Sequence, residues 1–206
     1  MTGEIKMTYL GSPALFWRQR SLIGDAASLE RELRTNVEDL VPHGIEIKAV
    51  SIEGAADYEL PLTVKFEVSG ALGSSTGKRL LIPCDIFAAN VKPSFPHEKR
   101  EIAVAFSYPH LVQDAVRIGF PTTLSVESTP LNDKTQFHTF AAYGMTTNST
   151  PTSVITRRDY VLAEIFYAAK DYPELRTFYS KMETKDQEAV VLTAAPSVNK
   201  PTPTGN

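Results

Sequence analysis

The chain has 206 residues, with 42% hydrophobic and 22% charged residues, close to globular averages, which excludes a wholly disordered, collagen-like or coiled-coil protein. With 21 Lys and Arg against 24 Asp and Glu, the formal net charge is −3, so the overall charge does not favour a nucleic-acid partner. We therefore expect one large domain, or one domain with a smaller appendage.

The hydropathy pattern and the cysteine count bear on the compartment. No apolar run reaches the roughly 18 residues that cross a bilayer, so we expect no membrane span. The first six residues lack the apolar segment of a signal peptide, and Ile5, Met7 and Tyr9 alternate with polar residues as in a strand. The single cysteine, Cys84, cannot form an internal disulfide. These features fit the cytoplasm, and equally a disulfide-free domain elsewhere whose export signal lies outside this chain.

Two helices are predicted. The first covers residues 26–40, with Asp25 as its N-cap and proline and glycine at 42 and 44 ending it. Its apolar stripe has helical spacing and comprises Leu29, Leu33, Val37 and Leu40. The second begins near Pro173, because proline suits the first helical position. Residues 188–193 follow it as either helix or a last strand.

From Ile45 onward the hydrophobic period changes from 3.6 to 2, which indicates strands. The clearest strand covers 62–68, where Leu, Val, Phe and Val alternate with polar residues. Shorter alternations occur at 45–49, 102–106, 116–120 and 124–126, and longer candidates at 136–145 and 152–165. Glycine- and proline-rich turns separate them without helical crossovers, which favours antiparallel pairing.

The predicted fold class is therefore α+β, mainly β: an antiparallel immunoglobulin-like β-sandwich with a C-terminal helix. We expect residues 1–55 to form a strand-and-helix portion packing on the sandwich, and 56–195 to form the sandwich and its helix. Residues 196–206, rich in Pro and Thr, are expected to be a disordered tail. Whether residues 1–24 belong to this fold or to a preceding domain stays open.

Cys84 is the first candidate for chemistry, because a cysteine nucleophile needs only a histidine base and a residue to orient it. The histidines are His43, His97, His110 and His138. Asp85 follows the cysteine directly, and its charge would raise the pKa of the thiol. We therefore favour a small semi-buried residue at a strand end over a nucleophile.

Other motifs predict no catalytic or metal site. The segment Gly73–Arg79 resembles a phosphate-binding loop but lacks its first glycine and its final Ser or Thr. The histidines have no metal-ligand spacing, and no carboxylate pair can be assigned to glycoside hydrolysis. We expect no cofactor and no metal.

The most unusual stretch is the segment from Lys92 to Arg100, which contains two prolines, one aromatic residue and several cations. Prolines stiffen such a loop, so it could recognise a partner domain or an acidic ligand, or simply connect two strands with Phe95 covering the sandwich edge. Trp17 is similarly suited to a domain contact or to the peripheral core. The candidate interface residues are Trp17, Lys92, Phe95, His97, Lys99 and Arg100.

Several separated motifs resemble one bacterial family. They are residues 60–62 (LPL), 76–83 (TGKRLLIP), 92–100 (KPSFPHEKR) and 172–181 (YPELRTFYSK), in that order. They resemble the C-terminal region of acidobacterial-type transglutaminase-like proteins, in which an N-terminal β-rich domain of unknown function precedes a papain-like core. The likeness spans nearly all of residues 4–193. The family's Cys-His-Asp triad lies in the core, upstream of the matching region, and relatives are expected to carry glycine in place of Cys84.

The resemblance implies a non-catalytic accessory or interaction module that packs on the upstream catalytic core or shapes access to it. It also implies an exported protein of the periplasm or cell envelope. One alternative is a sandwich that binds a polysaccharide or a peptide through an aromatic platform formed by Trp17, Tyr58, Phe95 or Tyr143. The other is a hydrolase or acyltransferase that uses Cys84.

Overall fold

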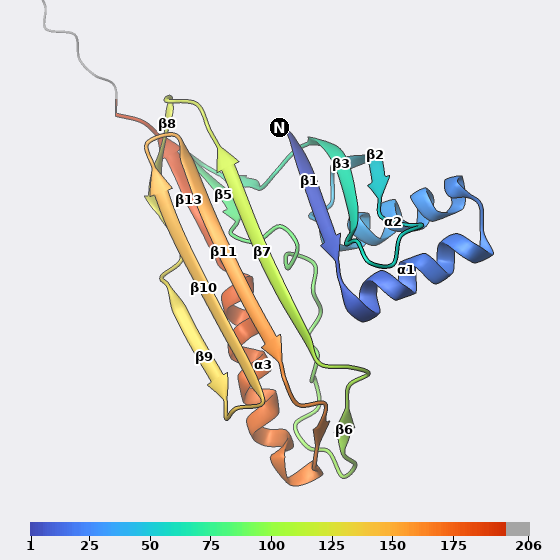
Figure 1. Ribbon diagram of the computed structural model, residues 1–206. Coiled ribbons are helices and arrows are strands. Elements are labelled where there is room, and N and C mark those ends of the chain that lie inside the picture. The colour runs from blue at the N-terminus through green and yellow to red at the C-terminus, as the bar shows by residue number, and fades with distance from the viewer. Residues whose placement is uncertain (197–206) are drawn as a thin grey trace, which may run out of the picture.

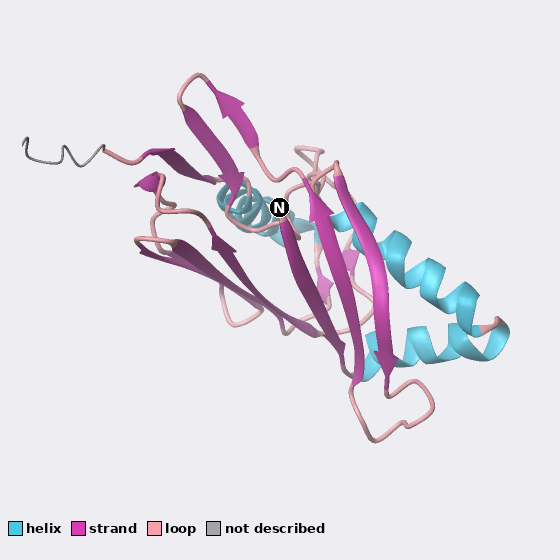
Figure 2. Cartoon of the chain, turned by 90° about the horizontal axis from the view of Figure 1, so that it is seen from above, coloured by secondary structure: helices cyan, strands magenta, loops and turns pink. Residues whose placement is uncertain are grey.

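A computed structural model describes residues 1–196, which form two packed units (Figure 1). The N-terminal unit contains β1 (Thr2–Tyr9), α1 (Gly11–Ile23), α2 (Ala26–Leu40), β2 (Ile45–Glu53) and β3 (Leu62–Gly70). Its antiparallel strands lie in the order β1-β3-β2, and both helices cover one face of this sheet (Figure 2).

Alternation along β3 explains how this sheet packs. Leu62, Val64 and Phe66 point inward and are fully buried against the helices. Lys65 and Glu67 point outward and form ion pairs with residues of β2. The predicted helix over 26–40 is confirmed as α2, and the Asp25 carboxylate accepts a hydrogen bond of 2.7 Å from the Ser28 amide, as an N-cap does.

The N-terminal unit extends to Gly70 rather than to residue 55. β3 pairs with β1 and with β2 along its length, so the strand predicted to begin the sandwich is the centre of the first sheet. The pairing of β1 with β3 also places the first residues inside this unit. Sequence analysis did not predict α1, because its apolar residues are spread around the helix and form no single stripe.

The C-terminal unit is built on a long antiparallel sheet. This sheet has the order β7 (His110–Gly119), β11 (Ser153–Leu162), β10 (Ala141–Thr150), β9 (Asp133–Phe137). A second sheet has the order β4 (Ser74–Thr76), β5 (Arg79–Pro83), β13 (Ala189–Ala194), β8 (Leu124–Ser128). The short strands β6 (Val104–Ala105) and β12 (Phe166–Tyr167) pair separately, and a 3-10 turn (Ala169–Asp171) leads into α3 (Tyr172–Asp186).

The helix α3 and the strand β13 follow one another along the same face of the long sheet (Figure 1). Together with β5 and β8 they enclose the larger hydrophobic core. The fold is thus α+β and mainly β, with antiparallel sheets and a C-terminal helix, as predicted. Residues 188–193, left open between helix and strand, lie mostly in β13, because their backbone pairs with both β5 and β8.

Two strand predictions differ from the structure by more than the position of their ends, because one is split and the other is mostly lost. The candidate at 136–145 is divided between β9 and β10 by a turn in which His138 has a positive φ of 49°. The alternation at 102–106 yields only the two-residue β6. The tail predicted at 196–206 lies outside the described residues except for Pro196.

The two units share a packed junction. Ile86 and Val116 of the C-terminal unit are buried in the hydrophobic cluster of the N-terminal unit, with Phe87 packed against it. The Asn90 side-chain amide donates a hydrogen bond to the carbonyl of Val41, just after α2. Among residues 1–196, no helix has the length and apolar character that a membrane crossing requires.

Candidate functional site

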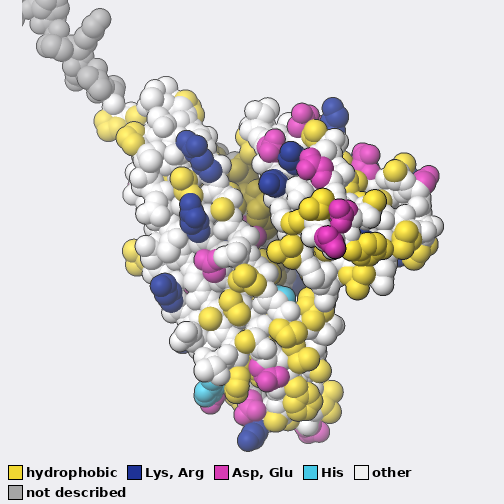
Figure 3. Space-filling view, in the orientation of Figure 1, with side chains coloured by type: hydrophobic (Ala, Val, Ile, Leu, Met, Phe, Trp, Pro, Cys, Tyr) yellow, Lys and Arg dark blue, Asp and Glu magenta, His cyan; other side chains and the backbone are white. Residues whose placement is uncertain are grey.

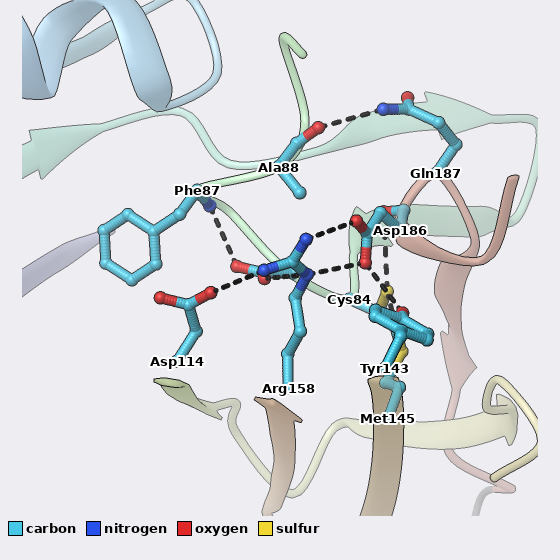
Figure 4. A network of polar contacts seen from close by, with 10 residues as sticks. Cys84, Phe87, Ala88, Asp114, Tyr143, Met145, Arg158, Asp186 and Gln187 are labelled. Carbon is cyan, nitrogen blue, oxygen red and sulfur yellow. Dashed lines mark hydrogen bonds and ion pairs between the residues drawn. The ribbon is translucent and has the colours of Figure 1, made fainter. Parts of the chain in front are cut away.

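One arginine and three aspartates meet inside the C-terminal unit (Figure 4). Arg158 lies on β11, and the strand register places Asp114 of β7 directly opposite it. Asp186 ends α3, and Asp85 follows β5, so both reach the arginine from the layer that covers the long sheet. We call these four residues the Arg158 cluster.

The arginine binds its three carboxylates unequally. Its Nε and Nη2 donate to the two oxygens of Asp186 at 2.8 Å each, a bidentate contact. Its Nη1 lies 3.3 Å from Asp114 Oδ2, and its Nε lies 3.8 Å from Asp85 Oδ2. Tyr143 on β10 donates a further 2.7 Å hydrogen bond to Asp186 Oδ1. The cluster therefore connects the long sheet to α3 and to the segment after β5.

Asp85 is the least satisfied member of the cluster. Its Oδ1 accepts a 2.9 Å hydrogen bond from the Phe87 amide, whereas its buried Oδ2 has no hydrogen-bond donor among the described residues. With all carboxylates ionised, three negative charges face one positive charge. Burial, and then the neighbouring Asp114 charge, raise the pKa of Asp85 to about 6. Burial also raises the pKa of Asp114.

Cys84 lies next to this cluster and is fully buried. Its Sγ is 3.8 Å from the sulfur of Met145 and 3.8 Å from the Asp186 carbonyl oxygen, and no histidine is among its described hydrogen-bond partners. Burial, followed by the charges of Asp85 and Asp186, raises the pKa of the thiol to about 12. The environment therefore keeps the sulfur as a neutral thiol packed in the core.

The loop Lys92–Arg100 is fastened onto α3 by three hydrogen bonds. The Ser94 amide donates to Glu183 Oε1 at 2.8 Å, Arg176 Nε donates to the carbonyl of residue 95 at 3.1 Å, and the Tyr172 hydroxyl donates to the carbonyl of residue 97 at 2.6 Å. Half-buried Phe95 packs edge-on against three rings, those of Phe106, Tyr172 and Tyr179. The loop is thus held in one shape although it has no regular secondary structure.

A groove of about 640 Å³ runs between this loop and α3. Apolar side chains of the loop and of the residue before it line one side, and polar side chains of α3 line the other: Val91, Pro93, Phe95 and Pro96 face Arg176, Ser180, Glu183 and Thr184. Asp186 of the Arg158 cluster also lines the groove. We call this space the loop–α3 groove.

The remaining interface candidates fall into two groups. Lys92, His97, Lys99 and Arg100 are exposed on the loop, with the Arg100 guanidinium 5.9 Å from the ring centre of Tyr172. Trp17, by contrast, lies in the N-terminal core, far from the loop in sequence and in the other unit, with its ring edge-on to Phe16. Its placement is that of a peripheral core residue.

The four aromatics considered for a ligand platform do not share a surface. Tyr143 is buried beside Arg158 and Trp17 is buried in the N-terminal unit. Tyr58 is 60% exposed but lies by Arg18, also in the N-terminal unit. Only Phe95 lines the loop–α3 groove.

Sequence analysis did not find the Arg158 cluster, although a signal was present. In β11, residues 154, 156, 160 and 162 are the buried phase of the strand, and Arg158 has the same phase. A charged residue at an inward position needs a charged partner. Its partners are 28 to 73 residues away in sequence, so the pattern could not name them. In residues 1–196, no group of His, Cys, Asp and Glu side chains could hold a metal ion.

Comparison with known proteins identifies a family. Residues 78–192 match DUF3858, described as a domain of unknown function with a solved structure. The chain belongs to the DUF3858 family. The DUF3858 match begins just before β5 and ends within β13, so it contains the whole Arg158 cluster, Cys84 and the loop–α3 groove. Searches of curated proteins and of solved structures give no match.

Proposed function

We propose that this chain is a non-catalytic accessory module of an exported bacterial transglutaminase-like protein, in which it packs on a papain-like catalytic core or shapes access to it. The placement of Cys84 carries this proposal. Cys84 carries the only thiol of the chain, and this thiol is buried beside Met145 and has a raised pKa. It is therefore poorly suited to act as a nucleophile. The four resembling motifs support the same conclusion.

The loop Lys92–Arg100 is the surface we assign to docking. Three hydrogen bonds to α3 already fix its shape, so little conformational entropy is lost when a partner binds. Its exposed Lys92, Lys99 and Arg100 would face carboxylates of the catalytic core. Periplasmic or cell-envelope location follows from the same proposal.

Reversing two charges of the loop tests the docking surface. We expect Lys99→Glu/Arg100→Glu to weaken binding of this chain to a separately produced catalytic core of the parent protein by about tenfold or more, because opposing charges would become like charges. Isothermal titration calorimetry measures the change. The matched control is Arg117→Glu/Arg157→Glu, which makes the same charge change on the outer face of the long sheet.

The proposal would be wrong if the loop variant and the control bound equally well, or if the wild-type chain did not bind the core at all. The control also shows whether any loss comes from total charge rather than from position. Circular dichroism of both variants checks that the fold is kept.

A second candidate function is peptide binding, which the loop–α3 groove favours. Its volume of about 640 Å³ is within the range of ligand sites. Its lining combines prolines and Phe95 with the polar residues of α3, whereas a sugar platform needs exposed rings on one surface. In this case the charge reversal at 99 and 100 would leave ligand binding unchanged, because neither residue lines the groove.

A further inference from the structure

Helix α1 is apolar on two opposite sides, and only one side is covered. Ala14, Trp17 and Arg18 face the N-terminal core and are buried. On the opposite side, Leu15, Phe16, Leu22 and Ile23 are exposed by 45%, 52%, 75% and 83%. Figure 3 shows apolar side chains gathered over this part of the N-terminal unit. An apolar face of this kind on a surface helix is normally covered by another element.

The size of this face is that of an interaction surface. From their exposed fractions, these four apolar side chains present roughly 500 Å² of surface, within the range at which a patch marks an interaction site. Other exposed apolar residues, such as Leu131 and Ile102, are separated from it. Two such faces in contact would bury about 1,000 Å², which reaches the lower limit of a specific protein interface.

The order of residues on this face fits a second copy of the same helix. Leu15 and Ile23 lie four residues on either side of Gln19, and Phe16 and Leu22 lie three residues on either side. In a two-fold symmetric contact, residue i of one copy meets residue j of the other and j meets i. An antiparallel pair of α1 helices centred on Gln19 would therefore place Leu15 against Ile23 and Phe16 against Leu22 of the second copy.

The charges near this face do not oppose such a pairing. The only charged residues of α1 are Arg18 and Arg20. Arg18 is turned inward and donates to backbone carbonyls, including that of Gly54 at 2.9 Å. Arg20 is paired with Glu32 of α2 at 2.7 Å. Gln19, at the centre, carries a side-chain amide that can both donate to and accept from its symmetric copy.

We infer that the outer face of α1 is a self-association surface through which two copies of this chain form an antiparallel, two-fold symmetric dimer. The contact rests on Leu15, Phe16, Leu22 and Ile23 packing across the symmetry axis at Gln19. It is separate from the loop docking surface, so this inference and the proposed function can fail independently.

Sedimentation equilibrium of the full 206-residue chain tests the dimer. The wild type is expected to show a species of twice the 22.7 kDa chain mass. Leu22→Glu/Ile23→Glu should raise the dissociation constant more than tenfold, because it places four carboxylates in the contact. The matched control is Leu131→Glu, which alters a side chain that is 81% exposed in the other unit and should leave the dimer unchanged.

A chemical cross-link tests the symmetry. Gln19→Cys should be joined to its copy by a short bis-maleimide at high yield, because the axis brings the two positions together, whereas Leu131→Cys should not. The native Cys84 is buried and does not compete. A wild-type chain that remains monomeric up to its solubility limit would overturn the inference, and so would a dimer that the substitutions in α1 do not weaken.

Discussion

Replacing Arg158 with methionine is expected to lower the free energy of unfolding by about 3–5 kcal/mol at pH 7.5, which is the loss typical of removing one partner from a buried ionic network. The methionine fills a similar volume but leaves Asp85, Asp114 and Asp186 facing one another without a positive charge. Urea unfolding followed by tryptophan fluorescence and circular dichroism measures the difference.

Two comparisons separate this effect from loss of packing. Arg157→Met changes the preceding residue, which points to the solvent on the other face of β11, and should change stability by about 0.5 kcal/mol or less. The defect of Arg158→Met should also become smaller as the pH falls, because protonation removes the repulsion among the carboxylates. A defect under about 1 kcal/mol, or one that is independent of pH, would show that the cluster does not hold the layers together.

Replacing Asp85 with asparagine is expected to raise the free energy of unfolding by about 1–3 kcal/mol at pH 7.5. The amide oxygen can still accept the hydrogen bond from Phe87, while the excess negative charge of the cluster is reduced. Burial raises the pKa of this carboxyl from 3.8 to about 6 in the folded protein, so the folded state binds the proton more tightly than the unfolded state.

The sign of the pH dependence follows from that shift. The contribution of Asp85 to stability is unfavourable above pH 6, improves as the pH falls from about 6 to about 4, and is constant below that. The advantage of the asparagine variant over the wild type should therefore disappear across the same interval. Unfolding experiments from pH 4 to pH 7.5 measure it. An asparagine variant less stable than the wild type at pH 7.5 would contradict this assignment.

Local sequence patterns were sufficient to predict several helices and strands. The apolar stripe and the cap of α2 predict its bounds, and the alternation in β3 predicts a strand with one buried face. Which sheet a strand joins is a long-range property. β3 resembles a sandwich strand in sequence, and its pairing with β1, more than 50 residues earlier, places it in the N-terminal unit. α1 was not predicted because its apolar residues lie on two faces of the helix and do not form one apolar stripe.

The candidate site was predictable only in part. The two prolines and Phe95 identified the loop Lys92–Arg100 as unusual, and this loop is hydrogen-bonded to α3. The position of Asp85 next to Cys84 correctly predicted a raised pKa of the thiol. Trp17 could not be placed, because an aromatic residue suits both a core and an interface. The Arg158 cluster assembles residues from three elements and the segment after β5, which only the folded chain brings together.

The proposed function depends on the Cys84 thiol not acting as a catalytic nucleophile. Its most direct test is the turnover of the proposed full-length transglutaminase-like parent carrying Cys84→Ala, beside the same protein with alanine at the nucleophile of the proposed catalytic core. We predict that Cys84→Ala retains activity within about twofold, whereas the core variant loses at least about a thousandfold, as when a nucleophile is removed. A comparable loss for Cys84→Ala, in a protein that unfolds at the wild-type temperature, would contradict the proposed function.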